Sequence, residues 1–259
     1  MKKIWQRRKA YYAYIMWRLG RRRILPSAFV NKKRIRENGS PLVDISKDPA
    51  FSFDERATKR SGLWVRAELV LMLRLAATAL PAGYKLHFFG GWRSMLVQWT
   101  AWLENLENKR RENPNLSNEE IERIARMTSA DPSRGDFGPH QTGGAIDLSI
   151  VDKDGQPLDM GTPFAYHGPE SQTFYPGITP QQYTNQMMLY NVLRFAGFQN
   201  YPGEWWHWSY GDRAWAAYQR KHHAIFGQVH CKDYKITPEE TKLFKQYSSG
   251  ENTKLNVKC

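Results

Sequence analysis

The sequence predicts a single α+β domain, and three observations support this fold class. The chain has 259 residues, of which 41% are hydrophobic, and this length allows one well-buried core. Stretches with helical spacing of apolar residues alternate with short apolar runs of strand length. After residue 38, the sequence contains neither an internal repeat nor a linker that would divide it into two domains.

The expected elements follow from these patterns and from residues that cap helices. The expected helices lie within the stretches 61–80, 95–111, 113–127, 180–197 and 237–247. The expected extended segments are a turn-rich lead-in, 38–55, and the apolar runs 84–92 and 145–151. Ser94 is the expected N-cap of the second helix, and Ser117 with Glu120 forms an expected capping box on the third. Pro180 stands near the start of the fourth helix and Gly197 after its end.

The formal charge of +13 is concentrated at the N-terminus. Residues 1–38, which we call the N-terminal arm, hold thirteen Lys and Arg residues and one acidic residue, Glu37. The remaining 221 residues hold 25 basic and 24 acidic side chains. A nucleic-acid-binding domain is expected to carry its basic residues on a folded face. The nearly neutral body argues against that class, and no nucleic-acid partner is expected.

An apolar and aromatic segment, residues 10–20, lies between the basic clusters of the arm and is too short to span a bilayer. Two interpretations stay open: a helix lying on anionic lipid through residues such as Trp5 and Trp17, or a solvated basic helix packed on the domain. We expect a cytoplasmic protein whose arm touches anionic membrane or wall polymer. The alternative is a periplasmic protein with the arm as an atypical export signal.

The two cysteines, Cys231 and Cys259, form no disulfide framework and no thiolate metal site. Three histidines lie near Cys231, namely His222, His223 and His230. Their spacing fits no closed zinc pattern, and a surface segment rich in histidine is the simpler interpretation.

The segment GPHQTGGAID, residues 138–147, supplies two candidate metal ligands. His140 and Asp147 are separated by residues that include Gly143 and Gly144, which allow a sharp turn. Asp147 heads an apolar strand, where an unpaired carboxylate would be costly. Zinc commonly binds histidine nitrogen and carboxylate oxygen, and catalytic sites leave one position for water.

A second segment, GEWWHW at 203–208, completes the set. His207 is the candidate third ligand, and Glu204 is the candidate general base for a water made acidic by the metal. Trp205 and Trp206 are expected to exclude bulk water and to hold these side chains, and they are candidate substrate-binding residues. Either motif alone arises often by chance, whereas together they supply all the parts for metal-assisted hydrolysis.

These motifs resemble the signature of the zinc D-alanyl-D-alanine dipeptidases of the VanX type. The pattern is His140, Gly143, Ala145 and Asp147, followed by EWWH at 204–207. Two further segments, GGWRS at 90–94 and DMGTPF at 159–164, also match, and the similarity covers roughly residues 40–215. The resemblance implies a small, mostly antiparallel sheet flanked by helices, with a zinc cleft on the sheet.

Carried over by position, the resemblance implies that His140, Asp147 and His207 bind one Zn²⁺ per chain. Glu204 is then the general acid/base, and Arg93 polarises the scissile carbonyl and stabilises its developing negative charge. The expected substrate is the D-Ala-D-Ala dipeptide, a small cell-wall precursor peptide.

Two positions depart from the family pattern. The family commonly has serine where this chain has Gly138, and aspartate where it has Ala165, and both residues are associated with holding the free amino group of the dipeptide. Four nearby residues are candidates to hold the amino group in place of the missing serine and aspartate, namely Asp136, Tyr166, His167 and Glu170. The loss of an ammonium partner predicts weaker selection for a free N-terminus.

Two alternatives to a dipeptidase stay open: a zinc D,D-carboxypeptidase acting on longer peptidoglycan stem peptides, and a zinc-containing binding module without catalysis. The expected organisation is the arm at 1–38, a zinc peptidase domain at 39–231, and a C-terminal helix with a polar tail at 232–259.

Overall fold

The computed structural model describes Ile15, Leu19 and residues 24–55, 63–126, 129–134, 138–166, 168–231 and 234–248. The predicted apolar segment of the arm, apart from Ile15 and Leu19, and the predicted polar tail after residue 248 lie outside these residues. The helices are α2 (Ser27–Val30), α4 (Ala67–Thr78), α5 (Met95–Glu112), α6 (Asn118–Ala125), α7 (Pro180–Phe195), α8 (Arg213–Tyr218) and α9 (Pro238–Ser248), with short 3-10 helices η1 (Pro132–Arg134), η2 (Pro139–Thr142) and η3 (Pro169–Ser171). The strands are β1 (Arg34–Ile35), β2 (Leu42–Asp44), β3 (Phe51–Phe53), β4 (Trp64–Arg66), β5 (Lys85–Gly90), β6 (Ala145–Val151), β7 (Gln199–Asn200), β8 (His207–Ser209) and β9 (His223–Ala224).

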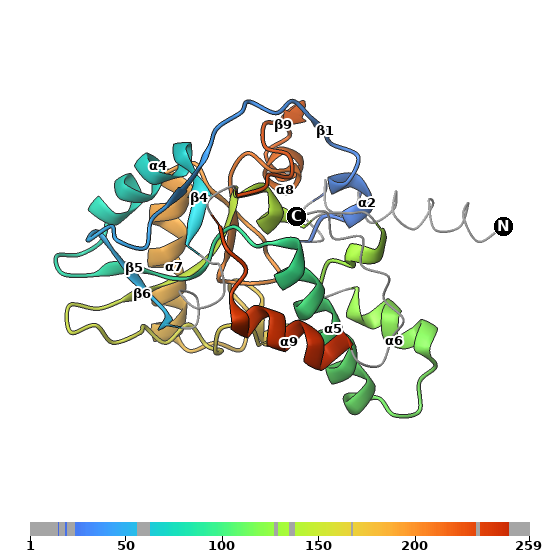
Figure 1. Ribbon diagram of the computed structural model, residues 1–259. Helices are drawn as coiled ribbons and strands as arrows, with labels where there is room; N and C mark the ends of the chain where they lie inside the picture. Colours follow the sequence, from blue (N-terminus) through green and yellow to red (C-terminus); the bar gives the residue numbers. More distant parts are fainter. Residues whose placement is uncertain are drawn as a thin grey trace.

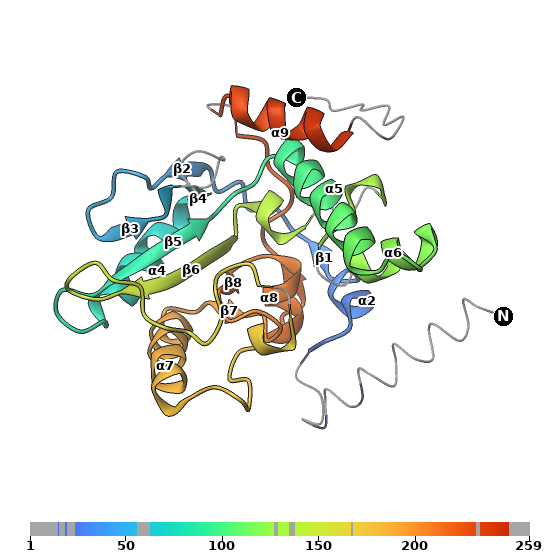
Figure 2. The same cartoon turned by 90° about the horizontal axis from the view of Figure 1, so that it is seen from below.

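A five-stranded sheet forms the centre of the molecule, with strand order β3-β5-β6-β8-β7 (Figure 2). The β3–β5 pair is parallel and the other pairs are antiparallel. Two smaller sheets, β1–β9 and β2–β4, lie outside it. The expected fold class, a single α+β domain with a small and mostly antiparallel sheet, is confirmed.

One face of the central sheet packs on α4 and α7 to form the main core. Ile146, Leu148 and Ile150 of β6 are fully buried in one cluster with Leu73 of α4 and Leu193 of α7. Because side chains alternate along a strand, Asp147 and Ser149 point to the opposite face. That face, away from α4 and α7, is where the candidate site lies.

The helices α5, α6 and α9 gather at the other side of the molecule from α4 and α7 (Figures 1 and 2). Trp102, Leu106 and Ile121 of α5 and α6 form a separate buried cluster, and Phe244 of α9 packs against it. As expected, Ser94 caps α5 through its Oγ, which accepts a hydrogen bond from the backbone of Val97 at 3.2 Å. This cap is adjacent to Arg93, so the start of α5 helps to place that arginine.

Most expected elements occur within one or two residues of their predicted bounds. The capping box of α6, the strand β6 and the position of α7 are confirmed, and Gly197 follows α7 with φ of 97°. The prediction of a helix from residue 61 is wrong at its start. Residues 64–66 form β4, because their backbone pairs with β2, and the helix begins only at Ala67. Pairing between distant segments overrides the helical spacing there.

The last residues of the arm pack on the domain. Arg34–Ile35 pairs in parallel with His223–Ala224, and Glu37 forms an ion pair with Arg66 at 3.0 Å. The boundary at residue 38 stays a prediction. In the described part of the chain, no helix combines the length and the apolar character needed to cross a bilayer.

Asp131 provides a pH-dependent contribution to stability that Asp131→Asn should remove. Burial raises the pKa of Asp131, but hydrogen bonds from Ser133 and Arg126 outweigh burial and hold the pKa below its ordinary range. An acidic group whose pKa is lower in the folded state stabilises the fold when the pH is above its pKa in the unfolded chain. This stabilisation is lost as the pH falls through the pKa of the folded state. Urea unfolding should therefore give a difference of about 1–3 kcal/mol between wild type and variant near neutral pH, shrinking below about pH 4. A difference that does not change with pH would contradict this assignment.

Candidate active site

Two histidines and one aspartate converge on the face of the sheet away from α4 and α7. One nitrogen each of His140 and His207 and one oxygen of Asp147 lie within 4.8 Å of one another, and all three residues are buried. The His140 Nε2–Asp147 Oδ2 distance is 3.2 Å, and the His207 Nδ1–Asp147 Oδ1 distance is 3.0 Å. The structure thus brings together all three residues that the sequence predicts as ligands.

Three different elements place these side chains. Asp147 lies on β6 and His207 on β8, and the two residues face each other directly in the antiparallel register. His140 lies on the short helix η2, which ends at Gly143 in the left-handed conformation, with φ of 71°. This backbone conformation favours glycine, and a Cβ at Gly143 would in addition lie 2.4 Å from Leu42 Cδ2 and force that side chain to move.

The donor atoms fit a divalent metal. His140 Nδ1 lies 2.8 Å from the carbonyl oxygen of Gly91, which only accepts hydrogen bonds, so Nδ1 carries the hydrogen. In the neutral ring, the lone pair of Nε2 then faces the Asp147 carboxylate. Two hydrogen-bond acceptors at this distance repel each other, and a metal ion bound by both would remove the repulsion. Ligand atoms around tetrahedral zinc are about 3.3 Å apart, close to the spacings seen here.

The charges of Asp147 and His140 agree with this fit. Burial raises the pKa of Asp147, but the two histidines outweigh burial and hold the pKa well below its ordinary range. Burial lowers the pKa of His140, which favours the neutral ring that metal binding needs. Burial lowers the pKa of His207, but the hydrogen bond to Asp147 and the charges of Asp147, Glu204 and Asp212 together outweigh burial and raise the pKa. The ring alone therefore favours the charged form, and a bound metal would displace its proton.

Glu204 lies beside the cluster in the turn that precedes β8. Its backbone N–H donates to Tyr201, and its carbonyl accepts from His207, so the segment before His207 is a turn rather than a strand. Burial raises the pKa of Glu204 to about 7, and its electrostatic neighbours include His207, Asp147 and Arg93. A carboxyl group with a pKa near neutrality is well suited to take up and release a proton.

Arg93 approaches the same cluster from the end of β5. Its Nη2 lies 3.8 Å from Asp147 Oδ2, and its backbone N–H donates to the carbonyl of His140 at 3.3 Å. The side chain is 29% exposed, so the guanidinium is accessible next to a buried carboxylate. This position allows it to meet negative charge on a bound molecule.

Trp205 and Trp206, between Glu204 and His207 in the sequence, are both buried and belong to the main core. Trp205 donates from Nε1 to Thr162 Oγ1 at 2.9 Å, and Trp206 meets the ring of Phe164 edge-on at 5.6 Å. A hollow of about 320 Å³ lies next to them; its lining includes Ser149, Phe164 and Trp205, but not Trp206. A role of either tryptophan in substrate binding stays a prediction.

The two positions that depart from the family pattern carry no group that would bind an ammonium. At Gly138, a Cβ would lie 2.9 Å from Gln141 Oε1, so the carboxamide of Gln141 fills that space. Ala165 is exposed and has φ of 62°, a left-handed conformation that aspartate adopts more readily than alanine.

Of the four candidate substitutes, Asp136 and His167 lie outside the described residues. The other two bind each other: the hydroxyl of Tyr166 donates to Glu170 Oε2 at 3.0 Å.

Two residues near the site were missed by the sequence reasoning, Arg66 and Glu37. Arg66 donates to the carbonyl oxygen of Thr142 on η2, and Glu37 pairs with Arg66. The available signal was an arginine inside the apolar run SGLWVRAELVLML, because a charge in such a run is costly unless it is paired.

Comparison with known proteins places the chain in a family. The family profile described as D-ala-D-ala dipeptidase matches residues 59–227. A D-alanyl-D-alanine dipeptidase of Synechocystis sp. is 38% identical over 96 residues, which are 32% of this chain and 39% of that protein. One of Enterococcus faecium is 30% identical over 147 residues, 54% of this chain and 69% of that protein. One of Escherichia coli is 35% identical over 68 residues, 26% of this chain and 35% of that protein.

These alignments thus span less than half of the Synechocystis and Escherichia coli relatives and about two thirds of the Enterococcus faecium one. The match to the family profile includes all five residues proposed above for metal binding and catalysis. This chain belongs to the D-Ala-D-Ala dipeptidase family of peptidases.

Proposed function

We propose that this protein is a zinc-dependent dipeptidase that hydrolyses D-Ala-D-Ala. The observation that carries the proposal is the convergence of His140, Asp147 and His207 around one point, with Glu204 and Arg93 beside it. A module that only binds zinc needs neither a carboxyl group with a pKa near 7 nor a partly exposed guanidinium. The family supports hydrolysis of a small peptide.

In the proposed mechanism, His140, Asp147 and His207 hold the zinc ion. When bound, zinc supplies a Lewis acid and lowers the pKa of water near the scissile carbonyl. Glu204 takes a proton from the attacking water and later gives one to the departing amine, which its raised pKa favours. Its position supports this role, because Glu204 lies in the turn that leads into His207.

Arg93 acts on the carbonyl oxygen of the substrate. Negative charge grows on this oxygen as water attacks, and a guanidinium already fixed nearby stabilises the charge without rearrangement. Two contacts hold the backbone of Arg93 in place: its N–H donates to the carbonyl of His140, and the next residue, Ser94, caps α5. Trp205 and Trp206 limit the access of bulk water.

A second candidate is a zinc D,D-carboxypeptidase that acts on longer stem peptides. The observations that favour it are Gly138 and Ala165, which offer neither a hydroxyl nor a carboxylate to a free amino group. An ammonium group placed there would lose hydrogen bonds to water that the side chains at these two positions do not replace. A peptide whose amino group is acylated avoids this cost.

Steady-state hydrolysis of three substrates by zinc-loaded protein tests both candidates. These are free D-Ala-D-Ala, N-acetyl-D-Ala-D-Ala and a stem pentapeptide that ends in D-Ala-D-Ala, with release of D-alanine as the readout and L-Ala-L-Ala as the control. For a dipeptidase we expect the highest kcat/KM on the free dipeptide. Activity only on the two blocked peptides would favour the carboxypeptidase, and no hydrolysis of any by zinc-loaded protein would reject both.

The contact of the arm with anionic membrane or wall polymer, and the cytoplasmic location with its periplasmic alternative, stay proposals. The contacts of β1 and Glu37 decide which deletion can test the membrane contact. A deletion of residues 1–38 takes away Glu37 and β1, whereas a deletion of residues 1–23 keeps both. Only the shorter deletion tests membrane contact without disturbing the domain.

A further inference from the structure

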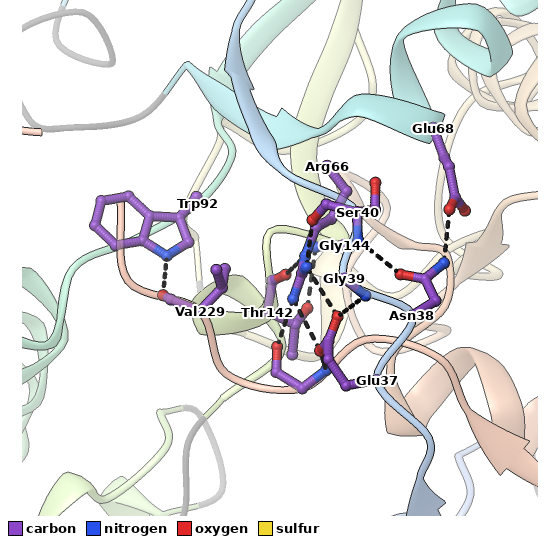
Figure 3. Close-up of polar contacts among 11 residues, drawn as sticks. Glu37, Asn38, Gly39, Ser40, Arg66, Glu68, Trp92, Thr142, Gly144 and Val229 are labelled. Atoms are coloured by element: carbon purple, nitrogen blue, oxygen red, sulfur yellow. Dashed lines mark hydrogen bonds and ion pairs between the residues drawn. The ribbon is translucent and has the colours of Figure 1, made fainter. Parts of the chain in front are cut away.

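Arg66 is a buried charge whose hydrogen-bonding capacity is fully used. Only 2% of its surface is exposed, and all five N–H donors of its guanidinium have an acceptor (Figure 3). The Nε atom donates to the carbonyl of Thr142 at 2.6 Å. The Nη1 and Nη2 atoms donate to the two carboxylate oxygens of Glu37 at 3.0 and 3.1 Å. The same two nitrogens also donate to the carbonyls of Ser40 and Gly227.

Glu37 completes the arrangement from the end of the arm. Its carboxylate also accepts the backbone N–H groups of Gly39, at 3.0 Å, and Gly227, at 2.5 Å. Burial raises the pKa of Glu37, but these backbone groups and Arg66 outweigh it, so the carboxylate stays charged. The pair joins three distant segments of the chain: the end of the arm, the end of β4 and the segment after β9.

The third partner of Arg66 is the turn that carries His140. Besides the bond from Nε to Thr142, the backbone N–H of Arg66 donates to the carbonyl of Gly143 at 2.9 Å. The side chain of Arg66 also packs against this turn, since a Cβ at Gly143 would lie 3.4 Å from its Cγ. One residue therefore holds two consecutive carbonyls of the turn, two and three positions after His140.

We propose that Arg66, held by Glu37, is a positioning residue that fixes the η2 turn and so sets the direction of the His140 imidazole. The inference rests on the proposed function, because it assigns a role within the same metal site. Arg66 acts through the backbone, and the structure gives it no contact with the ligand atoms themselves. In this respect Arg66 resembles residues that do not bind a metal themselves but orient its ligands, and loss of such residues weakens metal binding.

Lysine cannot replace this arginine. Its ammonium has three donors on one nitrogen, whereas Arg66 uses five donors on a planar fork that reaches the turn, Glu37, Ser40 and Gly227 at once. Arg66→Lys keeps the charge and releases the turn. Glu37→Gln keeps the size of the side chain and removes the charge that holds Arg66, so its effect should have the same direction and be smaller.

The test measures metal binding without turnover. Zinc affinity is obtained by competition with a chromogenic chelator, and the visible spectrum of the Co²⁺-loaded protein reports the geometry of the ligands. We expect about 10–100-fold weaker zinc binding in Arg66→Lys and a shifted Co²⁺ spectrum in both variants. The matched control is Arg126→Lys, because Arg126 pairs with Asp131 at 2.9 Å and, within the described part of the chain, forms its side-chain hydrogen bonds with Asp131 and Glu122 and not with the η2 turn.

Thermal unfolding of each variant sets a temperature at which the proteins are folded. Arg126→Lys should keep wild-type zinc affinity and spectrum even if it is less stable. Wild-type affinity and an unchanged spectrum in Arg66→Lys, or in Glu37→Gln if the lysine variant does not fold, would overturn the positioning role and leave the proposed function intact. Failure of the wild-type protein itself to bind zinc would instead overturn the proposed function.

Discussion

Replacement of Glu204 by glutamine is expected to lower kcat by about 10²–10⁴-fold while zinc binding is kept. Glutamine has nearly the same size and still accepts a hydrogen bond, but its amide takes up no proton near neutral pH. Burial raises the pKa of Glu204 to about 7, so the wild-type group exchanges a proton easily in the range where the variant has none to exchange. Single-turnover kinetics on D-Ala-D-Ala, with zinc content measured on the same sample, checks this result.

The control for this variant is Glu112→Gln, which removes an exposed carboxylate paired with Lys109 at the end of α5. It should leave both kcat and zinc content unchanged. Near-normal turnover of Glu204→Gln with full zinc occupancy would remove Glu204 from the proton-transfer role. Loss of zinc together with activity would show that Glu204 serves metal binding instead.

The three candidate ligand residues could be picked out from the sequence because each lies in a short motif whose chemistry is local. In GPHQTGGAID, the glycines, His140 and Asp147 stand within ten residues, and EWWH brings Glu204 next to His207. What no local pattern contains is the pairing of β6 with β8, which sets Asp147 directly opposite His207. Only the resemblance to a family indicated, from the sequence, that His207 shares a site with His140 and Asp147.

The errors and omissions of the sequence reasoning have the same physical origin. Residues 64–66 fit a helical pattern, yet they form a strand because β2, some twenty residues away, offers backbone partners. The helical pattern includes Arg66, and nothing in that pattern indicates that this arginine is buried and paired. The role proposed for it depends on contacts with Glu37, Thr142 and Gly227, which come from three separate parts of the chain. Contacts of this kind leave no periodic signal in the sequence.

Replacement of His207 by alanine should abolish both metal binding and hydrolysis. The imidazole supplies one of three donor atoms, and its Nδ1 lies 3.0 Å from Asp147 Oδ1, so its loss also removes a partner of a buried carboxylate. Loss of an outer group that merely orients a ligand weakens metal binding by about 10–100-fold, and loss of the ligand itself should exceed this range. Zinc content after dialysis, together with chelator competition, measures the effect.

The matched control is His222→Ala, because His222 is exposed and belongs to the histidine-rich segment near Cys231 that was considered as a second metal site. It should keep wild-type zinc content and turnover. If His222→Ala lost the metal and His207→Ala kept it, the ion would bind at the C-terminal histidines, and the His-Asp-His cluster would have no catalytic role. Comparison of His207→Ala with Glu204→Gln then separates the two halves of the EWWH motif: one variant loses metal and turnover, and the other loses turnover alone. A mechanism in which the metal is held by His207 and the proton is moved by Glu204 requires both results together.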